Sequence, residues 1–326
     1  MTKPGIVLIV VYIGRLPALF PLWLESCRSN PGIDWLIYTD DRTPYDYPPN
    51  VRPVYCNFAE IKDIFQRNFD FTITLDSVTK LCDYKTAYGD IFKEEIKDYG
   101  HWGYCDLDVI WGNLEKFIRE YTLLSYDKAL DAGHFTLFRN TPEITQLYRK
   151  GAEKGLMDYK TVYTSPEIFA FDEWGGSRGV NAIFLAHGKS LFYEKLLFAD
   201  IEVFSRNLQT TRTRYGDSIQ EEKQKRKILY QYLNGSLYQH FTTGEPHAAF
   251  RREEMYIHLQ KRNMVIPPHL SPNSFIIVPP NQILGREEME PLTFEVINRL
   301  GTLPGLYWAN VLPYLKKRFI TRIFKK

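Results

Sequence analysis

The sequence is 326 residues long and lacks the features that mark several common classes of protein. No stretch reaches the roughly eighteen uncharged residues that a membrane-spanning helix needs, and the N-terminus carries Lys3 but no long apolar run. The four cysteines have no close-paired spacing, which disfavours disulfides and zinc: Cys27, Cys56, Cys82 and Cys105. We therefore expect a cytoplasmic protein with reduced, buried thiols.

Two nucleotide-binding signatures are also missing. No Gly-x-Gly-x-x-Gly follows the first apolar run, and no Walker sequence occurs anywhere in the chain. These absences weaken the assignment to a dinucleotide-dependent enzyme or to a P-loop NTPase. The formal net charge is only +2, and we expect no nucleic-acid partner.

What the sequence does contain is the pattern of an α/β protein, with 25% charged and 44% hydrophobic residues. Apolar runs predict strands at 6–11, 35–38, 51–55 and 101–105, and apolar spacing predicts helices over 17–27, 58–69 and 78–99. Strand, helix and strand in this order indicate a mixed, mainly parallel central sheet flanked by helices. Ligands bind beyond the carboxyl ends of such strands, so a pocket is expected to be lined by Tyr12, Gly14, Arg15, Thr39, Asp40 and Asp41.

The pair Asp106 and Asp108 follows the predicted strand at 101–105 and leads into the apolar Val109-Ile110-Trp111. In an extended segment, side chains at i and i+2 point to the same face, so both carboxylates are expected to project together. Paired carboxylates suit Mg²⁺ or Mn²⁺ bound together with substrate phosphates. In the alternative interpretation, one aspartate caps a helix and the other is solvated.

A second polar group lies on the predicted strand Met255 to Leu259. One face of this strand carries Tyr256 and His258, and the basic residues Lys261 and Arg262 follow it. Imidazole is an acceptable ligand for Mn²⁺, and nearby cations offset charge that develops on a leaving diphosphate. A solitary histidine in a strand is also often only a packed or solvent-facing residue.

In one region a helix that carries Lys80, Asp83 and Lys85 is followed by a glycine-containing turn and then by the strand that leads to Asp106 and Asp108. This region resembles the donor-binding core of GT-A-fold, bacterial polysaccharide-type glycosyltransferases. The resemblance implies that Asp106 lies near the ribose and the metal, that Asp108 ligates the metal, and that Lys80, Asp83 and Lys85 hold the nucleotide. It also implies a metal-binding role for His258 and diphosphate contacts from Lys261 and Arg262.

Residues between these segments are candidates for contacts to the sugar and the acceptor. His134 begins a predicted strand over 133–140, and a helix capped by Thr141 is predicted over 142–150. In the run Phe171 to Gly176, either Asp172 or Glu173 is the candidate base that takes a proton from an acceptor hydroxyl, and Trp174 is expected to contact the acceptor. Alternatively, Asp172 caps a helix or Glu173 pairs with Arg178, and in a retaining enzyme these acids would bind acceptor hydroxyls.

The remaining elements are a helix over 181–187, a hairpin turning at Asn234-Gly235, a strand over 275–278 and a helix over 287–300. The last eleven residues carry six positive charges and no acid, interleaved with Phe319, Ile320, Ile323 and Phe324. Such a tail fits a basic amphipathic helix on an anionic membrane surface. A solvated helix end with cations that complement the helix dipole explains the same charges.

We therefore predict a cytoplasmic, membrane-peripheral GT-A-like glycosyltransferase that uses Mn²⁺ or Mg²⁺. It would move a sugar from a nucleoside-diphosphate donor, expected to be a UDP-sugar, to a hydroxyl of a bacterial surface glycan or lipid-linked precursor. Residues 1–112 form the expected donor half, 113–285 the acceptor half and 286–326 a helical basic tail. The alternatives are a nucleotidyltransferase acting on a sugar phosphate and a catalytically silent carbohydrate-binding or scaffold protein.

Overall fold

A computed structural model describes residues 5–173, 179–193, 197–211, 222–260, 262–286 and 291–323, with side chains to residue 316 in the last helix. The chain divides into two compact units. The first unit comprises Met1–Pro17, Asn30–Leu107 and Glu115–Tyr193. The second unit comprises Ala18–Ser29, Asp108–Leu114 and Glu194–Lys326. The chain thus crosses between the units several times, and one of these crossings falls between Leu107 and Asp108.

The first unit is built on a seven-stranded sheet in the order β3-β2-β1-β4-β7-β6-β8. Its strands are β1 (Ile6–Tyr12), β2 (Ile33–Thr39), β3 (Val51–Tyr55), β4 (His101–Cys105), β6 (Lys128–Ala132), β7 (Phe135–Arg139) and β8 (Leu191–Phe192). The strands from β3 to β4 pair in parallel, β7 is antiparallel to both of its neighbours, and β8 is parallel to β6. The predicted mixed, mainly parallel sheet is confirmed.

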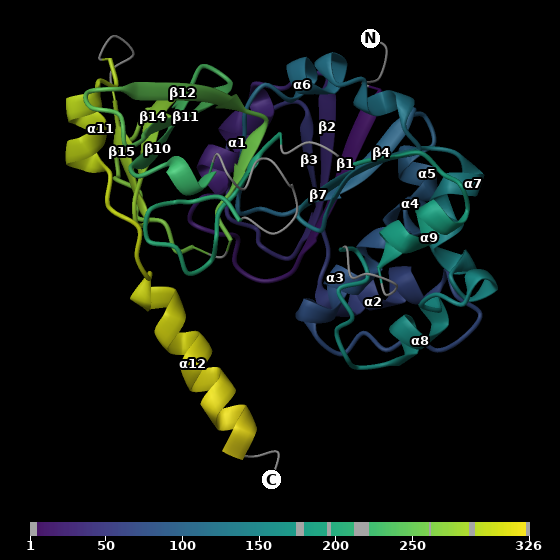
Figure 1. Ribbon diagram of the computed structural model, residues 1–326. Helices are drawn as coiled ribbons and strands as arrows, with labels where there is room; N and C mark the ends of the chain where they lie inside the picture. The colour runs from purple at the N-terminus through teal and green to yellow at the C-terminus, as the bar shows by residue number, and fades with distance from the viewer. Residues whose placement is uncertain are drawn as a thin grey trace. The chain divides into compact units, whose positions relative to one another are not determined.

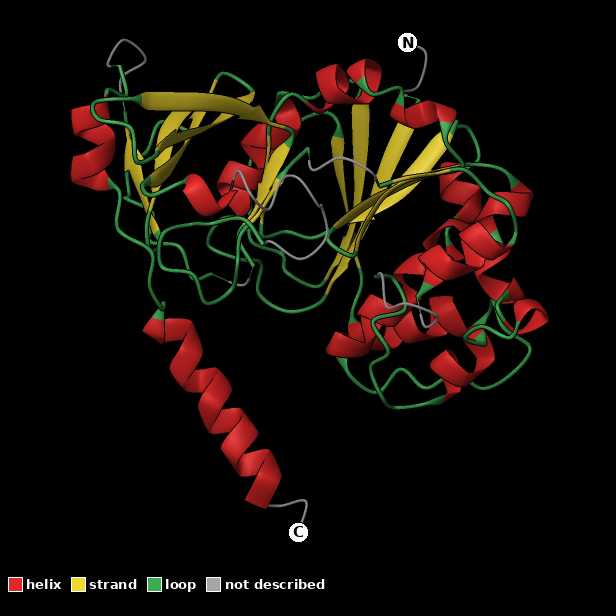
Figure 2. Ribbon diagram, in the orientation of Figure 1, coloured by secondary structure: helices red, strands yellow, loops and turns green. Residues whose placement is uncertain are grey.

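Helices gather on one face of this sheet (Figure 2). They are α2 (Phe58–Gln66), α3 (Leu81–Tyr84), α4 (Tyr88–Ile91), α5 (Lys93–Ile96), α7 (Pro142–Thr145), α8 (Tyr159–Thr164) and α9 (Val180–Ala186). Alternate strand residues such as Val7, Leu36 and Trp102 point into this core, where they join Phe65 of α2 and Phe184 of α9. Helix α6 (Leu114–Glu120) begins where the chain returns to the first unit.

The prediction of one long helix over 78–99 is wrong. This segment consists of α3, α4 and α5, with 3₁₀ turns at Val78–Lys80 and Lys85–Ala87. At the junctions Tyr84 and Ala87 have ψ angles of −8° and −3°, which lie outside the α-helical range. Gly89 further weakens the helix and is needed where it is, because a Cβ there would lie 2.3 Å from the Trp102 ring. Tertiary packing therefore overrides the continuous helical spacing of the sequence.

Other predicted helices are also shorter than expected. The segment 142–150 changes from α7 to a 3₁₀ turn over Leu147–Lys150, although Thr141 caps α7 as predicted, accepting a hydrogen bond from the Ile144 amide. In the segment predicted as helical over 287–300, the described helix is α11 (Phe294–Leu300), which begins at its own cap, Thr293. Helix α9 matches the helix predicted over 181–187 to within one residue at each end.

The second unit contains a five-stranded antiparallel sheet in the order β12-β11-β10-β14-β15. These strands are β10 (Ile228–Leu233), β11 (Ser236–Thr242), β12 (Ala249–Glu254), β14 (Ser274–Val278) and β15 (Gln282–Gly285). The predicted hairpin is confirmed, because Asn234 and Gly235 join β10 to β11 with φ angles of 46° and 84°. Positive φ at both turn residues is the requirement of a tight type I′ turn.

A second, three-stranded sheet in this unit has the order β5-β13-β9. Its strands are β5 (Val109–Trp111), β13 (Tyr256–His258) and β9 (Ala199–Asp200). Strand β13 runs antiparallel to β5 and parallel to β9. Helix α1 (Phe20–Arg28) also belongs to this unit and contributes Leu22 to its core. The short sheet thus joins segments from three distant parts of the sequence.

The last helix, α12 (Trp308–Ile323), extends away from the sheets of the second unit (Figure 1). The predicted C-terminal helix is therefore confirmed. Among the residues that the structure describes, no helix is both long and apolar enough to cross a membrane. The four cysteines are free, and Cys27, Cys56 and Cys105 are buried as expected, whereas Cys82 is only partly buried.

Candidate functional site

Asp106 follows β4 directly, in the first unit. The strand ends at Cys105, and residues 107–108 form a bend before β5 begins in a different sheet. The prediction of a continuous extended segment through Asp108 is therefore wrong, and strand alternation does not explain the orientation of the two aspartates. Instead, the Asp106 amide donates to the carbonyl of His134, 3.0 Å away, which fixes the backbone as it leaves the sheet.

Lys85 is the centre of a charged cluster in the first unit. Its ammonium donates to Asp106 Oδ1 at 2.7 Å and to the Gly133 carbonyl at 2.8 Å, and it lies 3.4 Å from Asp172 Oδ2. Burial opposes the charge of Lys85, but Asp106 and Asp172 raise its pKa well above the ordinary value. Lys85 is therefore a fixed cation that serves two carboxylates.

Asp172 is the buried member of this cluster. The residue is 2% exposed, and burial raises its pKa to about 7, although Lys85 acts in the opposite direction. The Tyr104 hydroxyl donates to the backbone carbonyl oxygen of Asp172 at 3.0 Å. A carboxyl group that titrates near neutral pH is suited to accept a proton. Its neighbour Glu173, the other candidate base, is exposed.

Gly133 makes room for both acids. A Cβ atom at this position would lie 2.6 Å from Cγ of Glu173 and 2.8 Å from Oδ2 of Asp172. Such separations are too short for carbon against carbon or oxygen, so only glycine fits here without displacement. The next residue, His134, also belongs to the first unit and is buried, with 6% of its surface exposed. Trp174, the predicted acceptor contact, lies outside the described residues.

Lys80 and Asp83 have structural partners. The Lys80 ammonium bonds to Asp83 and to the carbonyls of Val162 and Glu167, which uses all three of its donors. Asp83 is fully buried and also accepts from the amides of Phe169 and Phe171. Because these bonds are all internal, we correct the expected donor contact of both residues to a positioning role. They fix the segment that leads to Asp172.

The loops after β1 and β2 form as predicted at the carboxyl ends of neighbouring strands. Gly14 has a φ of 108°, and its amide donates to Asp40 Oδ1 at 2.7 Å. Thr39 is buried and accepts from the Asp41 amide, whereas Arg15 is exposed and Tyr12 is partly buried. The Asp40 carboxylate thus shapes the Gly14 turn, which only glycine adopts at low cost.

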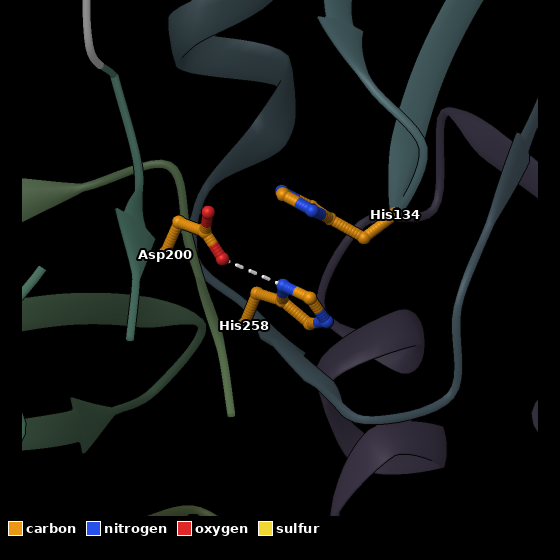
Figure 3. Close-up of side chains that lie close together, drawn as sticks. All are labelled: His134, Asp200 and His258. Carbon is orange, nitrogen blue, oxygen red and sulfur yellow. Dashed lines mark hydrogen bonds and ion pairs between the residues drawn. The ribbon is translucent and has the colours of Figure 1, made fainter. Parts of the chain in front are cut away.

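The second unit holds a carboxylate–histidine–carboxylate arrangement. Asp108 Oδ1 lies 3.3 Å from Nε2 of His258, and the Leu259 amide donates to the Asp108 carbonyl at 2.8 Å. On the other side of the ring, Nδ1 donates to Asp200 Oδ1 at 2.8 Å (Figure 3). Burial opposes protonation of the ring, but Asp108 and Asp200 raise the pKa of His258 to about 10. Asp108 and His258, both predicted to bind the metal, therefore lie beside each other in this unit.

Arg262 does not match its expected role. Its guanidinium group donates to the carbonyls of Pro280, Glu202 and Ser205 and lies over the Tyr307 ring. The residue is 5% exposed, and burial lowers its pKa to about 10. We therefore correct its role from a diphosphate contact to a buried support of the second unit. Lys261, predicted to act with it, lies outside the described residues.

Sequence reasoning missed two members of these clusters, Asp200 and Gly133. Asp200 is separated from His258 by 58 positions, and the strand that carries it, β9, is only two residues long. Nothing in the local pattern marks such a strand. The signal for Gly133 was its place beside His134, but a single glycine does not reveal which side chains approach it.

These features define an α/β protein whose polar clusters follow the carboxyl ends of its strands. The sequence pattern of a family of unknown function, DUF6625, matches residues 8–286, and the chain belongs to this family. No curated protein sequence matches it.

Two solved structures of low identity are similar to the chain. The galactosyltransferase LgtC, in complex with donor and acceptor sugar analogs, has 12% identity and a TM-score of 0.36, covering 66% of this chain and 82% of LgtC. The apo form of mouse xyloside xylosyltransferase 1 has 10% identity and a TM-score of 0.33, covering 60% of this chain and 87% of that protein.

Proposed function

We propose that this protein is a metal-dependent glycosyltransferase. It would move a sugar from a nucleoside-diphosphate donor, which we propose to be a UDP-sugar, to a hydroxyl of a bacterial surface glycan or lipid-linked precursor. The observation that carries the proposal is the contact of Asp108 with the Nε2 side of His258, with Asp106 only two positions earlier in the chain. Carboxylate and imidazole ligands of this kind suit Mn²⁺, and carboxylates suit Mg²⁺.

The side chains at this position can supply the ligand atoms for such a cation. Nδ1 of His258 is occupied by its bond to Asp200, which leaves Nε2 as the ligand atom on the side of Asp108. Asp106, Asp108 and His258 are the proposed ligands. When bound, the cation would act as a Lewis acid on the donor diphosphate. The Asp106 carboxylate is itself held by Lys85, which limits the directions in which it can turn.

Asp172 is the proposed general base. Its carboxylate would take the proton of the attacking acceptor hydroxyl as the bond from that oxygen to the anomeric carbon forms and the diphosphate leaves. A pKa of about 7 leaves a substantial share of the group deprotonated at neutral pH while it retains basicity. Glu173 is the alternative base. If the enzyme retains anomeric configuration, both acids would instead bind acceptor hydroxyls.

The remaining predicted contacts form part of the same proposal. The loops after β1 and β2 would bind the donor, with contacts from Tyr12, Gly14, Arg15, Thr39 and Asp40, and Lys261 would face the diphosphate. His134 and Trp174 would contact the acceptor. Residues 1–112 would supply most of the donor site and residues 113–285 most of the acceptor site.

The test is calorimetric titration of the purified full chain with UDP, GDP and CMP, each with and without Mn²⁺. We expect one nucleotide, UDP, to bind with Mn²⁺ and to bind weakly without it. Asp108→Ala should lose the metal-dependent part of nucleotide binding. Asp76→Ala is the matched control, because the Asp76 side chain is 69% exposed. Absence of binding under every condition would reject the proposed function and favour a scaffold protein.

The C-terminal helix supports a further part of the proposal, contact with an anionic membrane surface at the cytoplasmic face. Trp308, Leu312 and Leu315 are 56%, 59% and 49% exposed and recur at i, i+4 and i+7 of α12. This spacing puts them on one helical face. The sequence continues with Lys316, Lys317 and Arg318, which suit anionic headgroups.

Flotation with lipid vesicles tests this contact. The full chain should float with vesicles containing phosphatidylserine and much less with neutral vesicles, and Leu312→Glu should reduce flotation. Leu185→Glu, at a residue that is 51% exposed on α9, is the matched control. Equal flotation of wild type and Leu312→Glu would contradict membrane contact through α12.

A further inference from the structure

We infer that Asp200 is a positioning residue for the metal ligand His258, an inference that rests on the metal site of the proposed function. The Nδ1 atom of His258 lies 2.8 Å from Asp200 Oδ1 (Figure 3). A carboxylate can only accept, so Nδ1 carries the proton of this bond. In the neutral ring the lone pair is then on Nε2, on the side where Asp108 Oδ1 lies 3.3 Å away.

The backbone brings the two residues together in register. Strand β9 pairs with β13 so that Asp200 is opposite His258. The Ile201 amide donates to the His258 carbonyl at 3.0 Å, and the Thr211 amide donates to the Asp200 carbonyl at 2.6 Å. The bond between the side chains therefore lies between two backbone segments that are already fixed to each other.

The Asp200 carboxylate is itself held by other side chains. Gln260 Nε2 donates to Oδ1 at 2.7 Å, and the Thr211 hydroxyl donates to Oδ2 at 3.2 Å. The side chains of His258 and Asp200 are 9% and 13% exposed, so water competes little for their bond. Each of these contacts restricts the direction in which the Asp200 carboxylate faces the His258 imidazole.

A carboxylate behind a metal-binding histidine fixes the ring tautomer and makes the ligand nitrogen more basic. Loss of such a partner typically lowers metal affinity about 10- to 100-fold. Asp200→Ala removes both the charge and the acceptor. Asp200→Asn keeps an acceptor oxygen for Nδ1–H but removes the charge, so it should recover part of the affinity lost in Asp200→Ala.

The experiment is titration of the full chain with Mn²⁺ alone, with free Mn²⁺ measured by electron paramagnetic resonance. We expect affinity to fall in the order wild type, Asp200→Asn, Asp200→Ala, with a total loss of about 10- to 100-fold. The exposed neighbour Glu202→Gln is the matched control and should bind as wild type does. Circular dichroism melts accompany each titration to show that the variants are folded.

A second readout follows the ring directly. In the Mg²⁺-loaded protein, long-range ¹H–¹⁵N spectra should show the His258 proton on Nδ1 in wild type and a mixture of tautomers in Asp200→Ala. Unchanged affinity and an unchanged tautomer in Asp200→Ala would overturn the inference, as would an equal loss in Glu202→Gln. If wild type binds no Mn²⁺ at all, the metal site of the proposed function fails, and the inference fails with it. If wild type binds Mn²⁺ and Asp200→Ala binds it equally well, only the inference about Asp200 fails.

Discussion

Asp106 and Asp172 share one counter-ion, the ammonium group of Lys85, which lies 2.7 Å from the first carboxylate and 3.4 Å from the second. The two acids come from different parts of the first unit, one directly after β4 and the other more than sixty residues later. Because a single cation serves both, a change in the charge of either acid alters the surroundings of the other. The proposed metal-binding and proton-accepting groups are thereby coupled within this unit.

Replacement of Lys85 should destabilise the protein strongly. Lys85→Met leaves the buried Asp172 and the adjacent Asp106 without their shared cation. Loss of one partner from a buried pair typically costs about 3–5 kcal/mol in the free energy of unfolding. Urea denaturation at pH 7.5 measures this difference.

Lys62→Met is the matched control, because Lys62 forms a 3.1 Å ion pair with Asp76 while its side chain is 43% exposed. An exposed pair of this kind contributes about 0–1 kcal/mol. Similar losses in the two variants would show that Lys85 is no more than a surface cation.

Activity should depend on the protonation of Asp172. A base must be deprotonated to act, so kcat/KM should rise with pH through about 7, the pKa that burial gives this carboxyl. Asp172→Asn should remove this rise and lower the rate about 10²- to 10⁴-fold. Initial rates from pH 5 to 9 with the donor found by titration provide the profile. Loss of the rise in Glu173→Gln instead would assign the base to Glu173.

Gly133→Ala should disturb both acids at once. The added Cβ would lie 2.6 Å from Glu173 and 2.8 Å from Asp172, and overpacking of this kind costs about 1–3 kcal/mol. We expect lower stability in urea denaturation and lower activity than in the control Gly5→Ala, where a Cβ meets nothing within 4 Å. Two variants of equal stability and activity would contradict the close packing at Gly133.

The stability of the second unit should fall as pH rises through the range in which Glu254 titrates. Glu254 is 1% exposed, and burial raises its pKa from 4.5 to about 7, against the opposing effect of Arg252. Between these values the folded state keeps a proton that the unfolded state has released. This contribution to stability is complete below about pH 4.5 and is lost as pH rises to about 7, roughly 3 kcal/mol in all.

Urea denaturation from pH 4.5 to 8 measures this loss, and Glu254→Gln should flatten the decline. The exposed Glu245→Gln should retain the wild-type slope. Parallel curves for wild type and Glu254→Gln would refute the raised pKa of Glu254.

Local sequence patterns predicted a large part of the fold. The apolar run that begins at Ile6 forms β1, Asn234-Gly235 forms the hairpin turn, and Thr141 caps α7. These features depend on neighbouring residues, and so a short window of sequence contains most of the information. The predicted helix over 78–99 was wrong because the chain changes to 3₁₀ turns around Tyr84 and Ala87. Inside α4, Gly89 leaves room for the Trp102 ring, a contact between residues 13 positions apart that the helical spacing does not contain.

The candidate site divides in the same way. The sequence by itself determined that Asp106 and Asp108 follow a buried strand and that His258 lies on a short strand, because these positions follow from local hydrophobic patterns. Only the tertiary structure decided that Lys80, Asp83 and Arg262 bond to internal groups, that Lys85 joins Asp106 to Asp172, and that Asp200 lies behind His258. The partner of a charged side chain depends on which distant segments pack beside it, and no local pattern contains that choice.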